Sequence, residues 1–106
     1  MQNPYKFRHW EIPEYMHQGM EDYIKYGTPP GDFLSNIIQN KFVEAVFHAD
    51  NKNLRNIQAY AHWLYWEVPS VAWGNNEKFK IWISHKGLSG YDEYRMKKRG
   101  GDSSDG

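Results

Sequence analysis

The sequence predicts an all-α fold: one compact single domain of four to five short helices, with an extended N-terminal arm and a disordered C-terminal tail. Apolar residues recur at helical spacing, no run alternates apolar and polar residues as a half-buried strand does, and Gly and Pro separate the helical runs. The length of 106 residues suffices for one modest core. We therefore expect an arm over residues 1–12, a helical domain over 13–87 and a flexible tail over 88–106.

The first twelve residues are interpreted as an extended arm. Pro4 disfavours a helical conformation at the residue before it. Three aromatic side chains can anchor the arm to the domain: Tyr5, Phe7 and Trp10. The arm should therefore lie against the helices.

A first helix is expected from about Pro13, because proline fits the first helical turn, where an N–H group has no intrahelical partner. An apolar stripe follows at helical spacing: Met16, Met20, Tyr23 and Ile24. Gly27 is then placed to end the helix in the left-handed conformation that glycine adopts easily.

The Pro-Pro-Gly-Asp segment that follows is predicted to be a tight corner between two helices. Pro29 and Pro30 cannot continue a helix, and Asp32 is placed to cap the next one by accepting the N–H of Ser35. That next helix has four apolar residues at helical spacing: Phe33, Leu34, Ile37 and Ile38. The corner lacks the Lys and Ser or Thr of a phosphate-binding loop, so taken alone it indicates a turn.

Two further helices are predicted in the middle of the chain. The first has an apolar face comprising Phe42, Val43, Val46 and Phe47. Asp50 or Asn51 is expected to cap the second, a longer helix that Pro69 stops after about Glu67. Its predicted core side comprises Leu54, Ile57, Ala61, Leu64 and Val68.

A last helix is predicted to begin at a cap formed by Asn75 or Asn76 and to close at Gly87. Its inward residues are Phe79, Trp82 and Ile83. Residues 88–106 show no apolar period and are expected to be a tail. Their basic cluster, "YRMKKR", is interpreted as part of a solvated tail, so nucleic acid is not expected as a partner.

No catalytic, metal or cofactor motif is present in the sequence. The chain has no cysteine, and its five histidines fall on different segments without a His-x-x-x-His pair. The serines lack the Gly-x-Ser-x-Gly turn of a hydrolase nucleophile. We therefore expect a protein that is not an enzyme and that uses no cofactor and no metal.

Charge and hydropathy predict a cytoplasmic protein with no membrane partner. The formal net charge is +0, so no long-range field draws the chain to an anionic surface. No run approaches the roughly 20 apolar residues of a membrane helix, and the N-terminus lacks the apolar core of a signal peptide.

The stretch "AYAHWLYWEVPSVAWG", from Ala59 to Gly74, is the richest in aromatic residues. A helix with aromatic residues nearly all round is either buried all round or covered by a partner, and complete burial is difficult in so small a domain. We therefore predict a partner-binding surface here, formed by Tyr60, Trp63, Trp66 and Trp73. A protein, a nucleobase or a second copy of the chain, as a homodimer, would each fit it.

A second candidate site combines the corner with nearby basic residues. Exposed N–H groups at a helix start favour an anion, and basic side chains would add charge. The predicted anion-binding residues are Gly31, Asp32, Lys41 and Arg55.

The chain also resembles a group of short proteins encoded by bacteriophages and prophages, which have no assigned function. The resemblance covers roughly residues 12 to 82 and depends on an ordered set of short strings: "IPEYM", "YI", "PPGDFL", "AD", "LY" and "WG". It implies a phage origin, and small phage proteins of this kind often act in host takeover or counter-defence. The strings specify no chemistry.

These observations lead to three functional hypotheses. The first is a phage-encoded, non-enzymatic binding protein that inhibits a host defence or regulatory complex stoichiometrically, with a host or phage protein as partner. The second is a sponge that sequesters a small molecule, a nucleotide signal. The third is a virion assembly or structural accessory protein.

Overall fold

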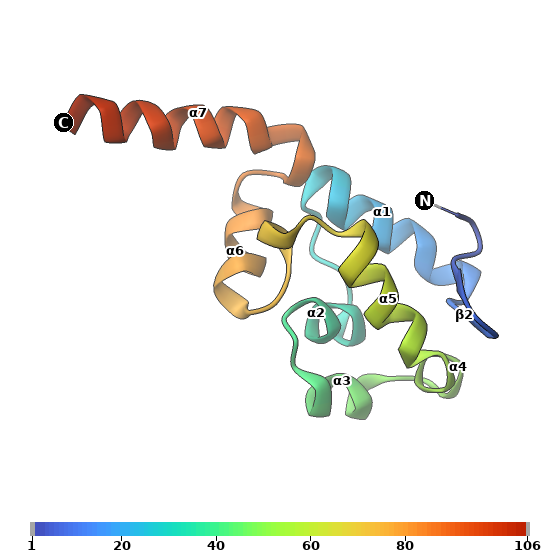
Figure 1. Cartoon of the computed structure of the whole chain (residues 1–106). Helices are drawn as coiled ribbons and strands as arrows, with labels where there is room; N and C mark the ends of the chain where they lie inside the picture. Colours follow the sequence, from blue (N-terminus) through green and yellow to red (C-terminus); the bar gives the residue numbers. More distant parts are fainter. Residues whose placement is uncertain (1, 106) are drawn as a thin grey trace.

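The computed structural model describes the backbone of residues 2–105 and the side chains of residues 2–98. Over that range the chain is mostly helical, with one small hairpin and seven α-helices, more than the four to five expected (Figure 1). The elements in chain order are β1 (Lys6–Phe7), β2 (Trp10–Glu11), the 3₁₀ helix η1 (Glu14–Met16), α1 (His17–Tyr26), α2 (Asp32–Ile38), α3 (Phe42–His48), α4 (Asn51–Arg55), α5 (Ile57–Glu67), the 3₁₀ helix η2 (Ser70–Ala72), α6 (Asn76–Ser84) and α7 (Gly87–Asp105).

The N-terminal arm is a hairpin, where the sequence predicts no strand. β1 and β2 pair antiparallel, with Phe7 opposite Trp10, because Arg8 takes a left-handed conformation (φ 55°) that turns the chain back. The arm is anchored to the domain as expected. Tyr5 and Ile12 are buried at the two ends of the hairpin, and the N–H of Ile12 donates to the carbonyl of Tyr5 (2.9 Å).

The first helix and the corner follow the prediction except at the cap. Gly27 closes α1 in the left-handed region (φ 64°). The N-cap of α2 is Gly31, whose carbonyl accepts the N–H of Ser35 (2.9 Å), and Asp32 lies inside the helix without a capping bond. The predicted Asp32 cap is wrong because the last non-helical backbone comes one residue earlier.

The predicted long helix is two helices, α4 and α5. Asp50 caps α4 as expected, accepting the N–H of Asn53 (2.7 Å). The helix then breaks at Asn56 (φ −112°), whose side chain accepts the N–H of Glu11 (2.8 Å) and donates to the carbonyl of Lys52 (2.8 Å). The bond from Glu11 ties the break to the hairpin, and the bond to Lys52 ties it to α4.

The core side of α5 differs from the predicted one. Leu64 and Val68 are buried as expected, but Leu54 and Ala61 are exposed. The buried face of α5 comprises Ala59, Tyr60, Trp63 and Leu64. Aromatic side chains bury more area than Leu or Ala, so the helix is rotated to place two of them inside.

The segment after α6 is a helix where the sequence predicts a tail from residue 88. Asn75 caps α6 by accepting the N–H of Lys78 (2.8 Å), and Gly87 is left-handed (φ 62°). The chain then continues as α7, which contacts α1 and α6 at its start and extends away from the body (Figure 1). Tyr91 packs against Trp82 at 5.6 Å between ring centroids. Such isolated apolar contacts do not produce a helical period of apolar residues in the sequence.

Over the described residues, none of the helices combines the length and apolarity that a bilayer span requires.

Candidate functional site

The predicted aromatic surface divides into core and surface residues. Tyr60 and Trp63 are fully buried, so their prediction as partner-binding residues is wrong for a partner that meets the folded domain. The Tyr60 hydroxyl donates to the side-chain oxygen of Asn53 (2.6 Å), and burial raises the pKa of Tyr60. Trp73 is half-buried against the core, whereas Trp66 is 67% exposed.

Trp66 belongs to a row of ring contacts that the sequence did not indicate. It lies edge-on to Tyr65 (5.1 Å) and next to His62 (6.1 Å). The ring of His62 stacks on Phe7 of the hairpin (4.3 Å), and Phe7 contacts Trp10. We call Phe7, Trp10, His62, Tyr65 and Trp66 the aromatic row. The row joins the N-terminal arm to α5, and the periodicity of the sequence does not reveal such a contact between distant segments.

The histidines are structural where their bonds are defined. The backbone N–H of Tyr5 donates to Nε2 of buried His17 (2.9 Å), and the Tyr5 hydroxyl pairs with Nδ1 of His62 (2.7 Å). His48 lies 4.0 Å from Asp32. Within residues 2–98, no three His, Cys, Asp or Glu side chains gather closely enough to hold a metal ion.

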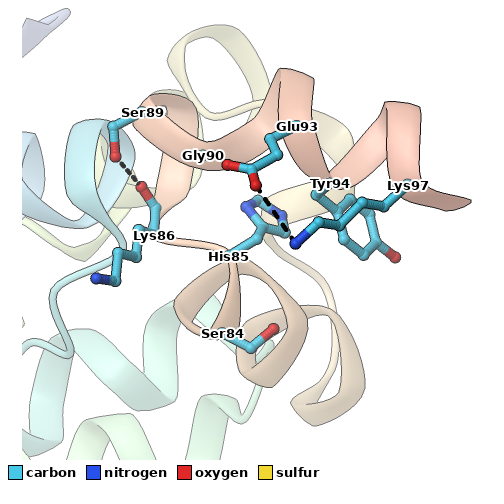
Figure 2. Close-up of a pocket in the computed structure, with 8 residues that line it drawn as sticks. All are labelled: Ser84, His85, Lys86, Ser89, Gly90, Glu93, Tyr94 and Lys97. Carbon is cyan, nitrogen blue, oxygen red and sulfur yellow. Dashed lines mark hydrogen bonds and ion pairs between the residues drawn. The ribbon is translucent and has the colours of Figure 1, made fainter.

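A cleft of about 440 Å³ lies between α6 and α7 (Figure 2). Several of its polar groups are already paired. Glu93 and Lys97 form an ion pair (3.3 Å), and the hydroxyl of Ser89 donates to the carbonyl of Lys86 (2.5 Å). In Figure 2 the side chain of Lys86 points away from the Glu93–Lys97 pair.

His85 in this α6–α7 cleft is positioned by packing. Its Nδ1 lies 3.2 Å from the carbonyl of Gly87 and its ring stacks on Tyr94 (4.6 Å). The Ser84 hydroxyl donates to the carbonyl of Ile81 (2.7 Å), so it is not oriented as a nucleophile next to the imidazole. The cleft is best explained as the joint between two helices.

The corner forms the wall of a second cleft, of about 300 Å³, which we call the acidic cleft. Among the described residues, the charged ones that line it are Asp32 and Asp50, and no Lys or Arg does. The described lining comprises Tyr15, Met16, Gly19, Pro30, Gly31, Asp32, Phe33, Leu34, Asp50 and Asn53.

A third cleft, of about 250 Å³, lies between α5 and the start of α3 and is largely apolar. Of the side chains that the structure describes, Lys41 is the charged one in its lining; the others are Ile37, Asn40, Phe42, Ile57, Gln58, Ala61 and Leu64. Phe42 at its rim is 64% exposed and Phe47 is 83% exposed, and Val43 between them is also exposed. We call this cleft with Phe42, Val43 and Phe47 the α3 surface.

The predicted anion-binding residues are not brought together in one cleft. Gly31 and Asp32 line the acidic cleft, Lys41 lines the α3 surface, and Arg55 lines neither. The corner also faces a second carboxylate, Asp50, which disfavours an anion there.

No protein-family model matches this chain, and no curated protein and no solved structure matches it at a significant level.

Proposed function

We propose that this protein is a non-enzymatic binding protein that forms a one-to-one complex with another protein through the α3 surface. The observation that supports the proposal is the outward apolar face of α3. Only Ala45 of that helix is buried, while Phe42, Val43 and Phe47 are exposed and Phe42 lines an apolar cleft. Monomeric domains seldom leave a contiguous apolar patch of this kind on their surface unless it binds a partner.

The energetics favour these side chains as interface anchors. Each buried Phe removes roughly 150–250 Å² from water, and apolar burial contributes about 25 cal/mol per Å². Two exposed Phe side chains, of which Phe42 lines a preformed cleft, fit the usual pattern in which a few residues supply most of the binding energy. The folded state gains little from these two side chains, because both are mostly exposed.

The phage-like sequence supports a more specific version of the proposal. A small phage protein that binds stoichiometrically acts in the host cytoplasm, and its partner is a component of a host defence or regulatory complex. Binding then inhibits that complex by covering one of its surfaces. This step depends on the sequence resemblance and on the absence of a paired nucleophile or metal cluster among the described side chains.

The test is quantitative capture from the bacterial host, comparing the wild type with variants of exposed residues. Phe47→Ser removes an anchor, Trp66→Ser probes the aromatic row, and Tyr26→Ser is a matched control at an exposed aromatic residue of α1. We expect one protein captured near one-to-one by the wild type, Trp66→Ser and Tyr26→Ser, and lost with Phe47→Ser.

Three results would overturn the proposal. Capture that survives Phe47→Ser but fails with Trp66→Ser moves the interface to the aromatic row. A nucleotide that co-purifies at one per chain supports the sponge hypothesis instead. A dimer in gel filtration that Phe47→Ser dissociates makes the α3 surface a contact between copies of this chain.

A further inference from the structure

We propose that the acidic cleft binds the side chain of a Lys or Arg residue presented by the protein partner. This inference deepens the proposed function, because it assigns a second contact and its chemistry to the same complex. The sequence predicts an anion site at this corner, and the proposal thereby assigns it the opposite charge preference.

The first observation is the fixed charge of Asp50. One carboxylate oxygen accepts the hydroxyl of Tyr15 (2.5 Å) and the other accepts the backbone N–H of Asn53 (2.7 Å). Both bonds favour the ionised form and lower the pKa of Asp50. The carboxylate is therefore held in place at the cleft by an element on each side, η1 and α4.

The second observation is that Asp32, which lines the same cleft, is open to solvent. Its side chain is 85% exposed, and the nearest basic group is the imidazole of His48 at 4.0 Å. No Lys or Arg side chain among the described residues forms an ion pair with Asp32 or Asp50. The charge of Lys52 helps to lower the pKa of Asp50 without forming an ion pair with it, so neither carboxylate of the cleft is paired with a described Lys or Arg side chain.

The third observation is the apolar floor. Phe33 and Leu34 are buried, and with Met16 and Pro30 they line the cleft. Lys and Arg have long apolar stems below their charged ends, and they pack those stems on apolar surfaces while the charge stays near water. A small metal ion would gain nothing from this apolar surface.

Two glycines supply independent support. Gly19 is the third residue of α1, a helical position at which glycine is less favourable than alanine. Gly31 has an extended backbone (φ −66°) that any residue adopts. A Cβ at either position would meet nothing within 4 Å, so neither backbone conformation nor packing requires glycine.

The shared property of these glycines is that both line the acidic cleft. A side chain at either position would extend into open space at the cleft and narrow it. The loss of helix stability at Gly19 is explained if the cleft must stay wide enough for a long side chain. Binding and stability should then respond to Gly19→Ala in opposite directions.

The experiment uses N-acetyl-arginine amide as probe and N-acetyl-citrulline amide as its neutral isostere, titrated into the isotope-labelled full chain and followed by NMR. We expect the arginine probe to bind with a Kd on the order of millimolar, shifting the backbone amides of Gly19, Gly31 and Asn53. The citrulline probe should leave them unshifted. Equal shifts with both probes would overturn the charge recognition.

The variants separate binding from folding. Asp50→Asn keeps a good N-cap while removing the charge, and paired with Asp32→Asn it should abolish binding. Gly19→Ala should raise the Tm yet weaken the affinity for the arginine probe by about tenfold or more. An unchanged affinity in a folded Gly19→Ala protein would overturn the role of the glycines and the proposal with it.

Two further arms identify the source of the cation and separate this inference from the proposed function. If spermidine binds about tenfold tighter than the arginine probe, or if Mg²⁺ displaces that probe, the ligand of the cleft is a free cation. Either result would overturn the proposal that a partner's side chain binds there. The Phe47→Ser variant should bind the arginine probe with wild-type affinity, because Phe47 lies on the α3 surface and not in the acidic cleft. Loss of partner capture with Phe47→Ser and loss of probe binding with Asp32→Asn are thus independent results.

Discussion

The backbones of Gly27 and Gly87 lie directly against each other, at the meeting point of α1, α6 and α7. A Cβ on Gly27 would lie 2.7 Å from the nitrogen of Gly87, and a Cβ on Gly87 would lie 2.5 Å from the nitrogen of Gly27. Both residues are also left-handed, at φ 64° and 62°. This contact leaves no room for a side chain on either residue.

Gly87→Ala should therefore be severely destabilising, by about 3 kcal/mol or more, because it combines a steric clash with an unfavourable φ. Thermal unfolding measures the loss. Gly31→Ala is the control: its φ is ordinary and its Cβ would meet nothing, so it should lose only the difference between glycine and alanine at an N-cap, about 1 kcal/mol, and its Tm should fall far less than that of Gly87→Ala. Equal Tm values for the two variants would contradict the close contact.

Tyr91→Ala should lower the free energy of unfolding by about 1–2 kcal/mol, although the sequence places this residue in a tail. Its ring is half-buried, contacts Trp82 and lies under the guanidinium of Arg95 (5.7 Å). Urea unfolding is the measurement, with Met96→Ala on the exposed side of α7 as control. An unchanged free energy for Tyr91→Ala would mean that α7 does not pack on the domain.

Tyr60→Phe should cost about 1–3 kcal/mol in urea unfolding, because it leaves the buried oxygen of Asn53 without its 2.6 Å donor. Trp66→Ala, on the exposed side of the same helix, should change stability by less than about 0.5 kcal/mol. If Trp66→Ala were the costlier of the two, the assignment of Tyr60 to the core and Trp66 to the surface would be reversed.

Acid unfolding should reveal the bond between Tyr15 and Asp50. The folded pKa of Asp50 is lowered from 3.8, so its contribution is complete above the unfolded pKa and is lost as the pH falls through the folded value. Tyr15→Phe removes the largest cause of that shift. The free energy of unfolding, measured from neutral to strongly acidic pH, should fall less steeply in the variant, and parallel curves would contradict the bond.

The sequence predicts the elements whose signals are local. The left-handed Gly27, the caps at Asp50 and Asn75 and the apolar face of α2 all depend on neighbouring residues, and each is confirmed. The Asp32 cap fails by one residue, which composition cannot resolve when a glycine and an aspartate are adjacent. These are the parts of the fold for which propensity and periodicity decide.

The candidate sites depend on contacts between distant segments, and there the prediction is partial. Apolar spacing on α5 fits two rotations of the helix, and Asn53, seven residues before Tyr60, favours the one that buries that tyrosine. Phe42 and Phe47 belong to the apolar face predicted for this helix, yet Ala45 is the residue of α3 that is buried and both Phe side chains are exposed. The acidic cleft joins η1, α1, α2 and α4, an arrangement that no local pattern encodes.

The bond between the indole of Trp82 and the carbonyl of Tyr23 spans 59 positions of the chain, and that between Tyr5 and His62 spans 57. Such long loops must close before their contacts stabilise anything, so the interior cannot be completed until α6 has left the ribosome. Until then the aromatic rings of α1 and α5 lack their final neighbours. A nascent chain that stops before α6 should therefore be a substrate for chaperones and proteases, which makes complete synthesis a condition for accumulation in the cell.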